Sequence, residues 1–149
     1  MVLNLRHLFD ISGDTKSLDY KVPLETLDQY KGFSFISPIA IKGIIVNRAG
    51  IVSLKFSLSV TMKLDCDRCL NEFERDFSFD FNHILVRSTN RQNDEYIVCL
   101  EDKLDLDELA ISDLLLQLPT KTLCSDDCKG LCYNCGTNLN MQECSCFEE

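Results

Sequence analysis

The sequence has no apolar run long enough to cross a membrane. A transmembrane helix requires about 18 to 20 predominantly apolar residues, whereas the first ten residues already contain Arg6, His7 and Asp10. The same charges argue against a targeting segment at this end. We therefore expect a soluble, cytoplasmic protein.

Recognisable catalytic motifs are also lacking. The chain has only two histidines, and they do not stand in HxxxH or HExxH spacing, so no catalytic zinc site with an open coordination position is apparent. No glycine-rich phosphate loop and no GxSxG nucleophile elbow occurs. The acidic run from Asp102 to Asp107 suits a helix N-terminus better than a catalytic pair. We therefore expect a protein that is not an enzyme.

Basic charge is scarce. The 149 residues include 15 lysines and arginines against 24 aspartates and glutamates, which gives a formal net charge of -9. An acidic protein binds phosphate backbones poorly by itself, although the sequence does not exclude a local basic face that could do so. If the protein acts near RNA, we expect its direct partner to be a basic protein. The sequence does not indicate an oligomeric state.

What the sequence does contain is a set of strands with alternating polarity. From Leu54 to Leu64 every second residue is apolar, and the same pattern returns from Phe73 to Leu85. This period is typical of strands with one buried face. A further strand is expected from Ile39 to Ile45, followed by a turn at residues 47–50. The three strands predict an antiparallel meander.

Two further strand regions are expected outside this meander. Apolar residues alternate from Leu3 to Ile11 and from Leu18 to Val22, which predicts a second hairpin near the N-terminus. Another short strand is expected from Tyr96 to Leu100. It contains Cys99, which has no neighbouring cysteine at ligand spacing and is interpreted as a buried thiol.

One helix is expected, from about residue 106 to residue 118. Asp105 can cap its N-terminus, Glu108 stands at capping-box spacing, and Pro119 follows its end. We therefore expect an α+β protein that is mainly antiparallel β, with a meander sheet or partly closed barrel, one covering helix and a C-terminal zinc-bound cysteine tail. The expected division is a β domain over residues 1–121 and a cysteine-rich tail over residues 122–149.

Eight of the nine cysteines stand in close pairs. The spacings are two CxxC, one CxxxC and one CxC, and an odd number of cysteines without a signal peptide does not suit a disulfide framework. Thiolates at such spacings can reach one tetrahedral ion. Two structural zinc ions are therefore expected, and the candidate ligands are Cys66, Cys69, Cys124, Cys128, Cys132, Cys135, Cys144 and Cys146.

The eight cysteines can be divided between the two sites in two ways. In the favoured division, Cys66 and Cys69 at the tip of the long hairpin join the first tail pair, so that zinc docks the tail on the sheet. The last four cysteines then form a local site. In the alternative, the four cysteines between Cys124 and Cys135 form one group.

Three segments carry a family resemblance. They are CDRCL at residues 66–70 with Phe73 after it, the Leu-Pro pair at residues 118–119, and the segment from Cys124 to Asn140 with its CKGLCYNCGTNLN sequence. In these segments the chain resembles the YceD family of ribosomal RNA accumulation proteins. It departs from the family pattern at Tyr133, where proline is common.

The resemblance implies a bacterial and plastid family linked to accumulation of large-subunit ribosomal RNA, with no enzymatic activity attached. The family gene often neighbours that of a small zinc-ribbon protein of the large subunit. Some members lack the last cysteine group, which implies that the site with Cys66 and Cys69 is the core one.

We therefore expect a non-catalytic zinc-binding accessory factor of large-subunit biogenesis that binds a ribosomal protein or an assembly intermediate. The alternative is a zinc-thiolate redox sensor or holdase chaperone, since clustered cysteines can oxidise and release zinc. A nucleic-acid-binding zinc ribbon is disfavoured by the acidic composition.

Overall fold

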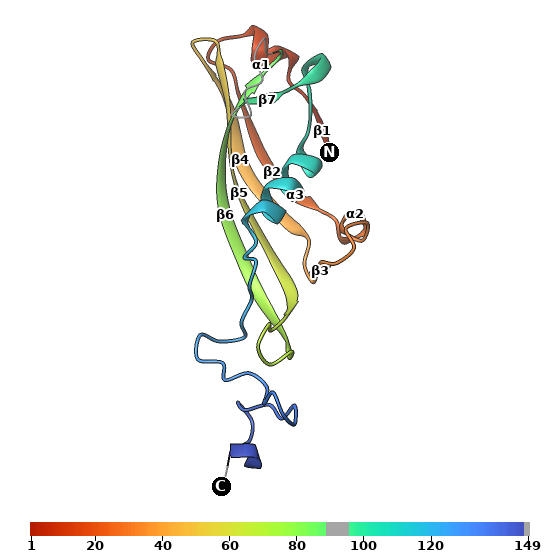
Figure 1. The fold of residues 1–149 in the computed structure, drawn as a ribbon. Helices are drawn as coiled ribbons and strands as arrows, with labels where there is room; N and C mark the ends of the chain where they lie inside the picture. The colour runs from red at the N-terminus through yellow and green to blue at the C-terminus, as the bar shows by residue number, and fades with distance from the viewer. Residues whose placement is uncertain (89–95, 148–149) are drawn as a thin grey trace.

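A long, curved antiparallel sheet forms the body of the protein. The computed structural model describes residues 1–88 and 96–147, and Figure 1 shows an elongated molecule with the sheet at one end and the cysteine tail at the other. The sheet is built on the consecutive strands β4 (Ile39–Arg48), β5 (Ile51–Asp65) and β6 (Glu72–Val86). The predicted meander is confirmed, and so is the α+β, mainly antiparallel fold class.

The meander is extended at both edges. The strand order is β2-β4-β5-β6-β7, and β3 pairs separately with the end of β5. Unlike the other pairs, β6 and β7 are parallel. The remaining bounds are β1 (Val2–Asn4), α1 (Arg6–Asp10), β2 (Thr15–Val22), α2 (Leu24–Leu27), β3 (Ser34–Phe35), β7 (Tyr96–Val98), β8 (Lys103–Asp105), α3 (Leu106–Gln117) and two 3-10 turns at Leu100–Asp102 and Ser145–Phe147.

The prediction of an N-terminal hairpin from the alternation of apolar residues is wrong. Residues 2–4 form β1, which pairs with β8, and the chain then turns into the short helix α1. β2 pairs with β4 instead. Leu5 and Leu8 are both buried, and this three-residue spacing places them on one side of a helical turn. The apolar residues of this segment alternate by chance, and the spacing that matters is that of a helix.

The core lies between the inner face of the sheet and α3. All inward-facing residues of β5 from Val52 to Met62 are buried, as the period of two requires. Ala110, Ile111 and Leu114 of α3 are buried against them. The Asp105 side chain caps the helix by accepting hydrogen bonds from the N–H groups of residues 107 and 108. The helix therefore begins where the sequence predicts.

Polar contacts fix the helix and the N-terminal segment on the sheet. His83 of β6 and Asp113 of α3 lie 2.6 Å apart. The buried Asn47 donates to the carbonyl of Leu8 at 2.6 Å and accepts from the N–H of Gly50, so it joins α1 to the β4–β5 turn. Within the described ranges, no helix is long and apolar enough to span a bilayer.

Candidate metal centre

The first pair of cysteines lies in the turn between β5 and β6. Two main-chain hydrogen bonds close this turn: the N–H of Leu70 donates to the Cys66 carbonyl, and the N–H of Cys66 donates to the Asn71 carbonyl. Leu70 has a positive φ of 61°, which lets the chain reverse within so few residues. We call residues 66–69 the knuckle. Its geometry brings the thiols of Cys66 and Cys69 to the same side.

The tail reaches the knuckle through hydrogen bonds that hold its main chain. Asp67 and Thr122 exchange two of them, at 2.8 Å from the Asp67 N–H to the Thr122 carbonyl and at 2.6 Å from the Thr122 N–H to the Asp67 carboxylate. Arg68 donates to the Cys128 carbonyl at 2.9 Å. Arg75 of β6 donates to the Leu123 carbonyl at 2.6 Å. These contacts place the first tail cysteines beside the knuckle.

Four thiols meet at this junction. The Sγ atoms of Cys66 and Cys128 lie 3.7 Å apart, and those of Cys69 and Cys124 lie 3.6 Å apart. All four Sγ atoms lie within 4.8 Å of one another. A zinc ion with Zn–S bonds of about 2.3 Å requires tetrahedral sulfurs about 3.8 Å apart. The donor set therefore fits a tetrahedral metal ion, and we call it site 1.

A glycine allows the close approach of the tail to the knuckle. Gly130 has a positive φ of 79°, and a Cβ atom added there would lie 3.3 Å from the Arg68 carbonyl oxygen. A side chain at this position would be both strained and crowded. Gly130 stands two residues after Cys128, so the sequence around the tail thiols of site 1 is adapted to the contact.

The last four cysteines form a second group, site 2. Cys132 and Cys135 lie in a turn closed by the Gly136 N–H, which donates to the Cys132 carbonyl. The Cys144 Sγ lies 3.3 Å from that of Cys132 and 3.4 Å from that of Cys135, and Cys146 completes the group within the same 4.8 Å limit. The structure thus groups the eight cysteines as in the division that we favoured, and not as in the alternative.

The pKa shifts of the thiols in site 1 favour a bound cation. Burial opposes ionisation of Cys66, but N–H groups of the knuckle and of Cys124 outweigh it and lower the thiol pKa to about 6. The Asn140 side chain lowers the pKa of Cys128. The hydrogen bond with Cys128 and burial raise the pKa of Cys124 to about 12. Some thiols therefore ionise readily and oppose the ionisation of their neighbours, and a divalent cation would relieve that repulsion.

Site 2 has the same pattern but a more open setting. Hydrogen bonds from the Thr137 hydroxyl and N–H lower the pKa of Cys135 to about 6. Hydrogen bonds with Cys144 and Cys135 raise the pKa of Cys146 to about 12. Cys135 and Cys146 are exposed, whereas three of the four cysteines of site 1 are buried. Reagents in solvent can therefore reach site 2 more directly.

Several residues that support the sites were not identified from the sequence. Asn140 donates to the Cys128 Sγ at 3.2 Å and accepts from the Lys129 N–H at 2.8 Å, so it joins the loop of site 2 to a ligand of site 1. Arg68 and Thr122 hold the tail as described above. Asn140 and Arg68 lie inside the segments that carry the family resemblance, which was the only signal available for them.

The ninth cysteine, Cys99, lies apart from the two groups. Cys99 is buried in the core, and burial together with Asp102 raises the pKa of its thiol to about 11. It lies outside both cysteine groups, as expected. The described part of the expected tail ends at residue 147, so residues 148–149 of the predicted range lie outside the described residues.

The comparisons with known proteins give one match. The family model named large ribosomal RNA subunit accumulation protein YceD matches residues 54–149, which include most of β5, all of β6 and α3, and all eight paired cysteines. Searches among curated proteins and among solved structures gave no match. The matched region covers more than half of the chain, and it contains the three segments in which the resemblance was first noted. The chain therefore belongs to the YceD family, whose name assigns it a role in accumulation of large-subunit ribosomal RNA.

Proposed function

We propose that the protein is a non-catalytic accessory factor of large ribosomal subunit biogenesis, which carries two structural zinc ions and acts by binding a basic ribosomal protein or an assembly intermediate that contains one. The observation that carries the proposal is the pair of four-thiol groups within the region matched by the family model.

Zinc is the metal that best suits these donors. Closed sites with four cysteine ligands are typical of structural zinc, whereas carboxylate and carbonyl oxygens suit magnesium and calcium. When bound, the ion would supply charge neutralisation and cross-linking. At site 1 it would tie Cys66 and Cys69 to Cys124 and Cys128, and at site 2 it would close the loop from Cys132 to Cys146. Elemental analysis of freshly purified, reduced protein should give about two zinc ions per chain.

A binding role rather than a catalytic one is supported by the ligand chemistry. A site with four thiolate ligands leaves no coordination position for water or substrate. Outside the cysteine groups, the closest pair of a histidine and a carboxylate in the described chain is His83 with Asp113, and these two join β6 to α3. That contact explains the pair structurally, so no reaction is assigned to it.

The charge of the protein supports a basic partner. The net charge of -9 favours encounter with a positively charged protein and disfavours unaided binding to RNA. Ribosomal RNA would then be affected through the protein that the factor holds. Binding before the partner meets RNA would shield its positive charge.

Depletion of the protein tests the pathway. Sucrose-gradient profiling should show fewer large subunits and less mature large-subunit ribosomal RNA, with small subunits comparatively intact. A copy with Cys69→Ser should fail to restore the profile, whereas Cys99→Ala should restore it, since Cys99 lies outside both cysteine groups. An unchanged ratio of large to small subunits after depletion would contradict the proposal.

The exposure of Cys135 and Cys146 favours one alternative, a redox sensor or holdase chaperone. Zinc thiolates that solvent reaches can be oxidised to disulfides with release of the metal, the electrons going to an oxidant such as peroxide. Mild peroxide treatment separates the two functions. The alternative requires zinc release together with a gain in the ability to suppress aggregation of an unfolded protein, whereas the accessory factor requires no such gain.

A further inference from the structure

The outer edge of β6 is unpaired over most of its length. Along one edge, β6 pairs with β5 from Glu72 to Leu85. Along the other edge, which we call the outer edge, β7 pairs only with residues 84–86. Among the residues that the structure describes, no other segment forms main-chain hydrogen bonds with the outer edge from Glu72 to His83. At about 3.3 Å per residue, this edge is roughly 40 Å long.

This edge lacks several of the features that prevent strand addition, although it carries acidic residues and the inward-facing Arg75. Natural edge strands are commonly blunted by lysine, proline or a β-bulge. The sequence of β6 contains no lysine, proline or glycine, and its register with β5 is continuous. Arg75 and His83 point inward, but Arg75 is held by the Leu123 carbonyl and His83 by Asp113. Apart from the contacts of Phe73 and Arg75 with the tail, the edge is therefore open to an additional strand.

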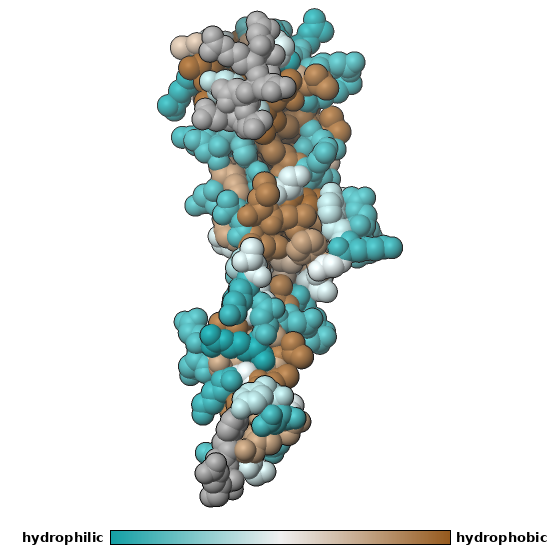
Figure 2. Space-filling model, in the orientation of Figure 1, coloured by the Kyte–Doolittle hydropathy of each residue, from teal (hydrophilic) through white to brown (hydrophobic). Residues whose placement is uncertain are grey.

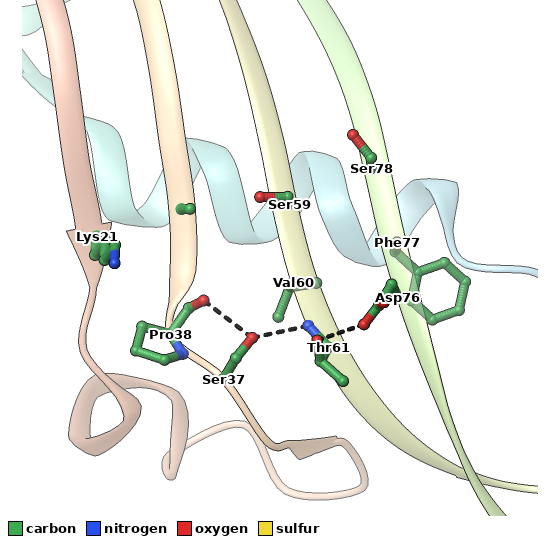
Figure 3. A pocket seen from close by; sticks show the side chains of 10 residues that line it. Lys21, Ser37, Pro38, Ser59, Val60, Thr61, Asp76, Phe77 and Ser78 are labelled. Carbon is green, nitrogen blue, oxygen red and sulfur yellow. Dashed lines mark hydrogen bonds between the residues drawn. The ribbon is translucent and has the colours of Figure 1, made fainter.

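The inner face of β6 is apolar and incompletely covered. Its residues Phe77, Phe79 and Phe81 form a row with ring centroids 6.0 and 6.2 Å apart, and all three are half-buried. The inward-facing residues of β5 beside them are fully buried. Figure 3 shows the Phe77 ring beside β6, on the side away from β5. Figure 2 shows hydrophobic surface gathered in the region of α3. A neighbouring strand with apolar side chains would cover these rings.

The outer face of the same strand is acidic. Glu72, Glu74, Asp76 and Asp80 alternate with the inward-facing residues and are all exposed. Asp76 and Asp80 accept hydrogen bonds from Thr61 and from a serine of β5, which orients their carboxylates on this face. Asp76 lines a hollow of about 450 Å³. Figure 3 shows the short side chains of Ser59 and Ser78 beside it, which leave room for a long side chain.

We propose that the outer edge of β6 from Glu72 to His83 binds an extended segment of a partner protein in which basic and apolar residues alternate. In such a segment, the apolar residues would cover the phenylalanine row and the lysines or arginines would lie beside the acidic row. A second copy of β6 is a poor occupant, because pairing of two identical edges would place acidic rows together. This inference rests on the proposed function, because the basic partner named there is the protein that the β6 edge would hold.

A peptide of about ten residues with alternating lysine and valine, long enough to span about 33 Å, is a direct probe. Fluorescence anisotropy at about 0.15 M salt, where surface charges are largely screened beyond about 8 Å, should show saturable binding to the zinc-loaded protein. A peptide of the same composition with its lysines and valines in separate blocks should bind at least ten-fold more weakly. Hydrogen exchange of the complex should slow at main-chain amides of residues 72–83 and stay unchanged in β2.

Charge reversal provides the matched control. The double variant Asp76→Lys, Asp80→Lys should lose at least ten-fold in affinity. The control Asp19→Lys, Glu25→Lys changes the net charge equally, but its residues lie on the other edge strand β2 and on α2, so it should bind normally. If the first variant fails to fold, Asp76→Asn, Asp80→Asn keeps the hydrogen-bond acceptors and should still weaken binding several-fold.

Three results would overturn the inference: equal binding of the block peptide, protection confined to the cysteine tail, or self-association through β6 in sedimentation experiments. The two proposals fail separately. Loss of large subunits on depletion without peptide binding would remove only the β6 surface, and peptide binding without a ribosomal defect would remove only the ribosomal role.

Discussion

The sheet and the cysteine tail are ordered by different interactions. The sheet buries an unbroken row of large apolar side chains along β5 and covers it with α3. The buried cluster of the tail junction consists of Cys66, Cys69 and Cys128, with only a few partly buried apolar residues around it. Two of the largest apolar side chains of the tail, Tyr133 and Met141, are about four-fifths exposed, at 82% and 80%.

The difference shows what each region requires in order to fold. Burial of apolar surface can stabilise the sheet by itself, because it removes many side chains from water. A segment of about 25 residues without such a core needs a metal or another cross-link. The tail should therefore depend on its ligands, and the following experiments test that dependence from the largest expected effect to the smallest.

Metal removal should unfold the tail and leave the sheet folded. After treatment of reduced protein with a strong chelator, amides of residues 122–147 should exchange as in an unfolded chain, while those of β4 and β5 stay protected. Hydrogen exchange with mass spectrometry, together with elemental analysis, measures both effects. If the metal-free tail stayed protected from exchange, the tail would not depend on metal for its fold.

Acidification should release metal in the same region. The thiols of Cys66 and Cys135 have a pKa near 6, lowered from the usual value near 9. A group with a lowered pKa in the folded state contributes stability above its unfolded pKa, and that contribution is lost as the pH falls through the folded value. Because a bound metal holds its thiolate ligands ionised below these metal-free values, the metal should be released only as the pH falls below about 6. A zinc-sensitive dye follows it, and release that is independent of pH would exclude thiolate ligation.

Loss of one ligand should matter more at site 1 than at site 2. Site 1 would cross-link the β5–β6 turn to residues more than fifty positions later, whereas site 2 closes a local loop. The melting temperature should therefore fall further for Cys69→Ser than for Cys144→Ser. Differential scanning fluorimetry compares the two variants, with Cys99→Ala as a control for loss of a thiol. Equal or reversed shifts would show that the tail is not coupled to the sheet in this way.

A substitution in the sheet should have the opposite selectivity. At Gly43 of β4, an added Cβ atom would lie 2.2 Å from the Lys55 carbonyl oxygen and 2.6 Å from the Phe56 Cβ, so main-chain atoms of β5 would have to move. Gly43→Ala should therefore destabilise the protein by about 1–3 kcal/mol. Denaturant unfolding measures the loss, while the zinc content of the folded protein should stay unchanged. A change in zinc content would mean that metal binding by the tail depends on the packing of the sheet.

The sequence predicts the regular part of the sheet better than its ends. The strands β4, β5 and β6 are long and alternate over many residues, so the period of two is clear, and Asp105 and Pro119 mark the ends of α3. In the short N-terminal segment, the alternation of apolar residues suggested a strand, whereas tertiary packing of Leu5 and Leu8 favours a helix. The parallel pairing of β7 with β6 depends on a long-range contact and leaves no local pattern.

The cysteine groups show a similar division. Pair spacing indicated which cysteines act together, because each pair can reach one ion only if the chain turns between its members. The hydrogen bonds that position the tail join Arg68, Asp67 and Thr122 across more than fifty residues, and no local pattern encodes such contacts. The grouping of the cysteines could therefore be predicted, whereas most of the residues that support the two groups could not.

Asn140 gives the smallest and most selective test, because it lies in the loop of site 2 but donates to a ligand of site 1. Removal of a hydrogen bond to a metal ligand commonly weakens metal binding by about ten-fold to a hundred-fold. Asn140→Ala should fall near the lower figure, since Cys128 keeps the N–H of Gly130 as a second donor. Gln142→Ala changes an exposed amide side chain nearby and should have no effect. Competition with a chelator of known affinity resolves the two sites, and the loss should occur at site 1 alone. A loss at site 2 instead would mean that Asn140 supports its own loop, and the two sites would then be independent units joined only by the chain.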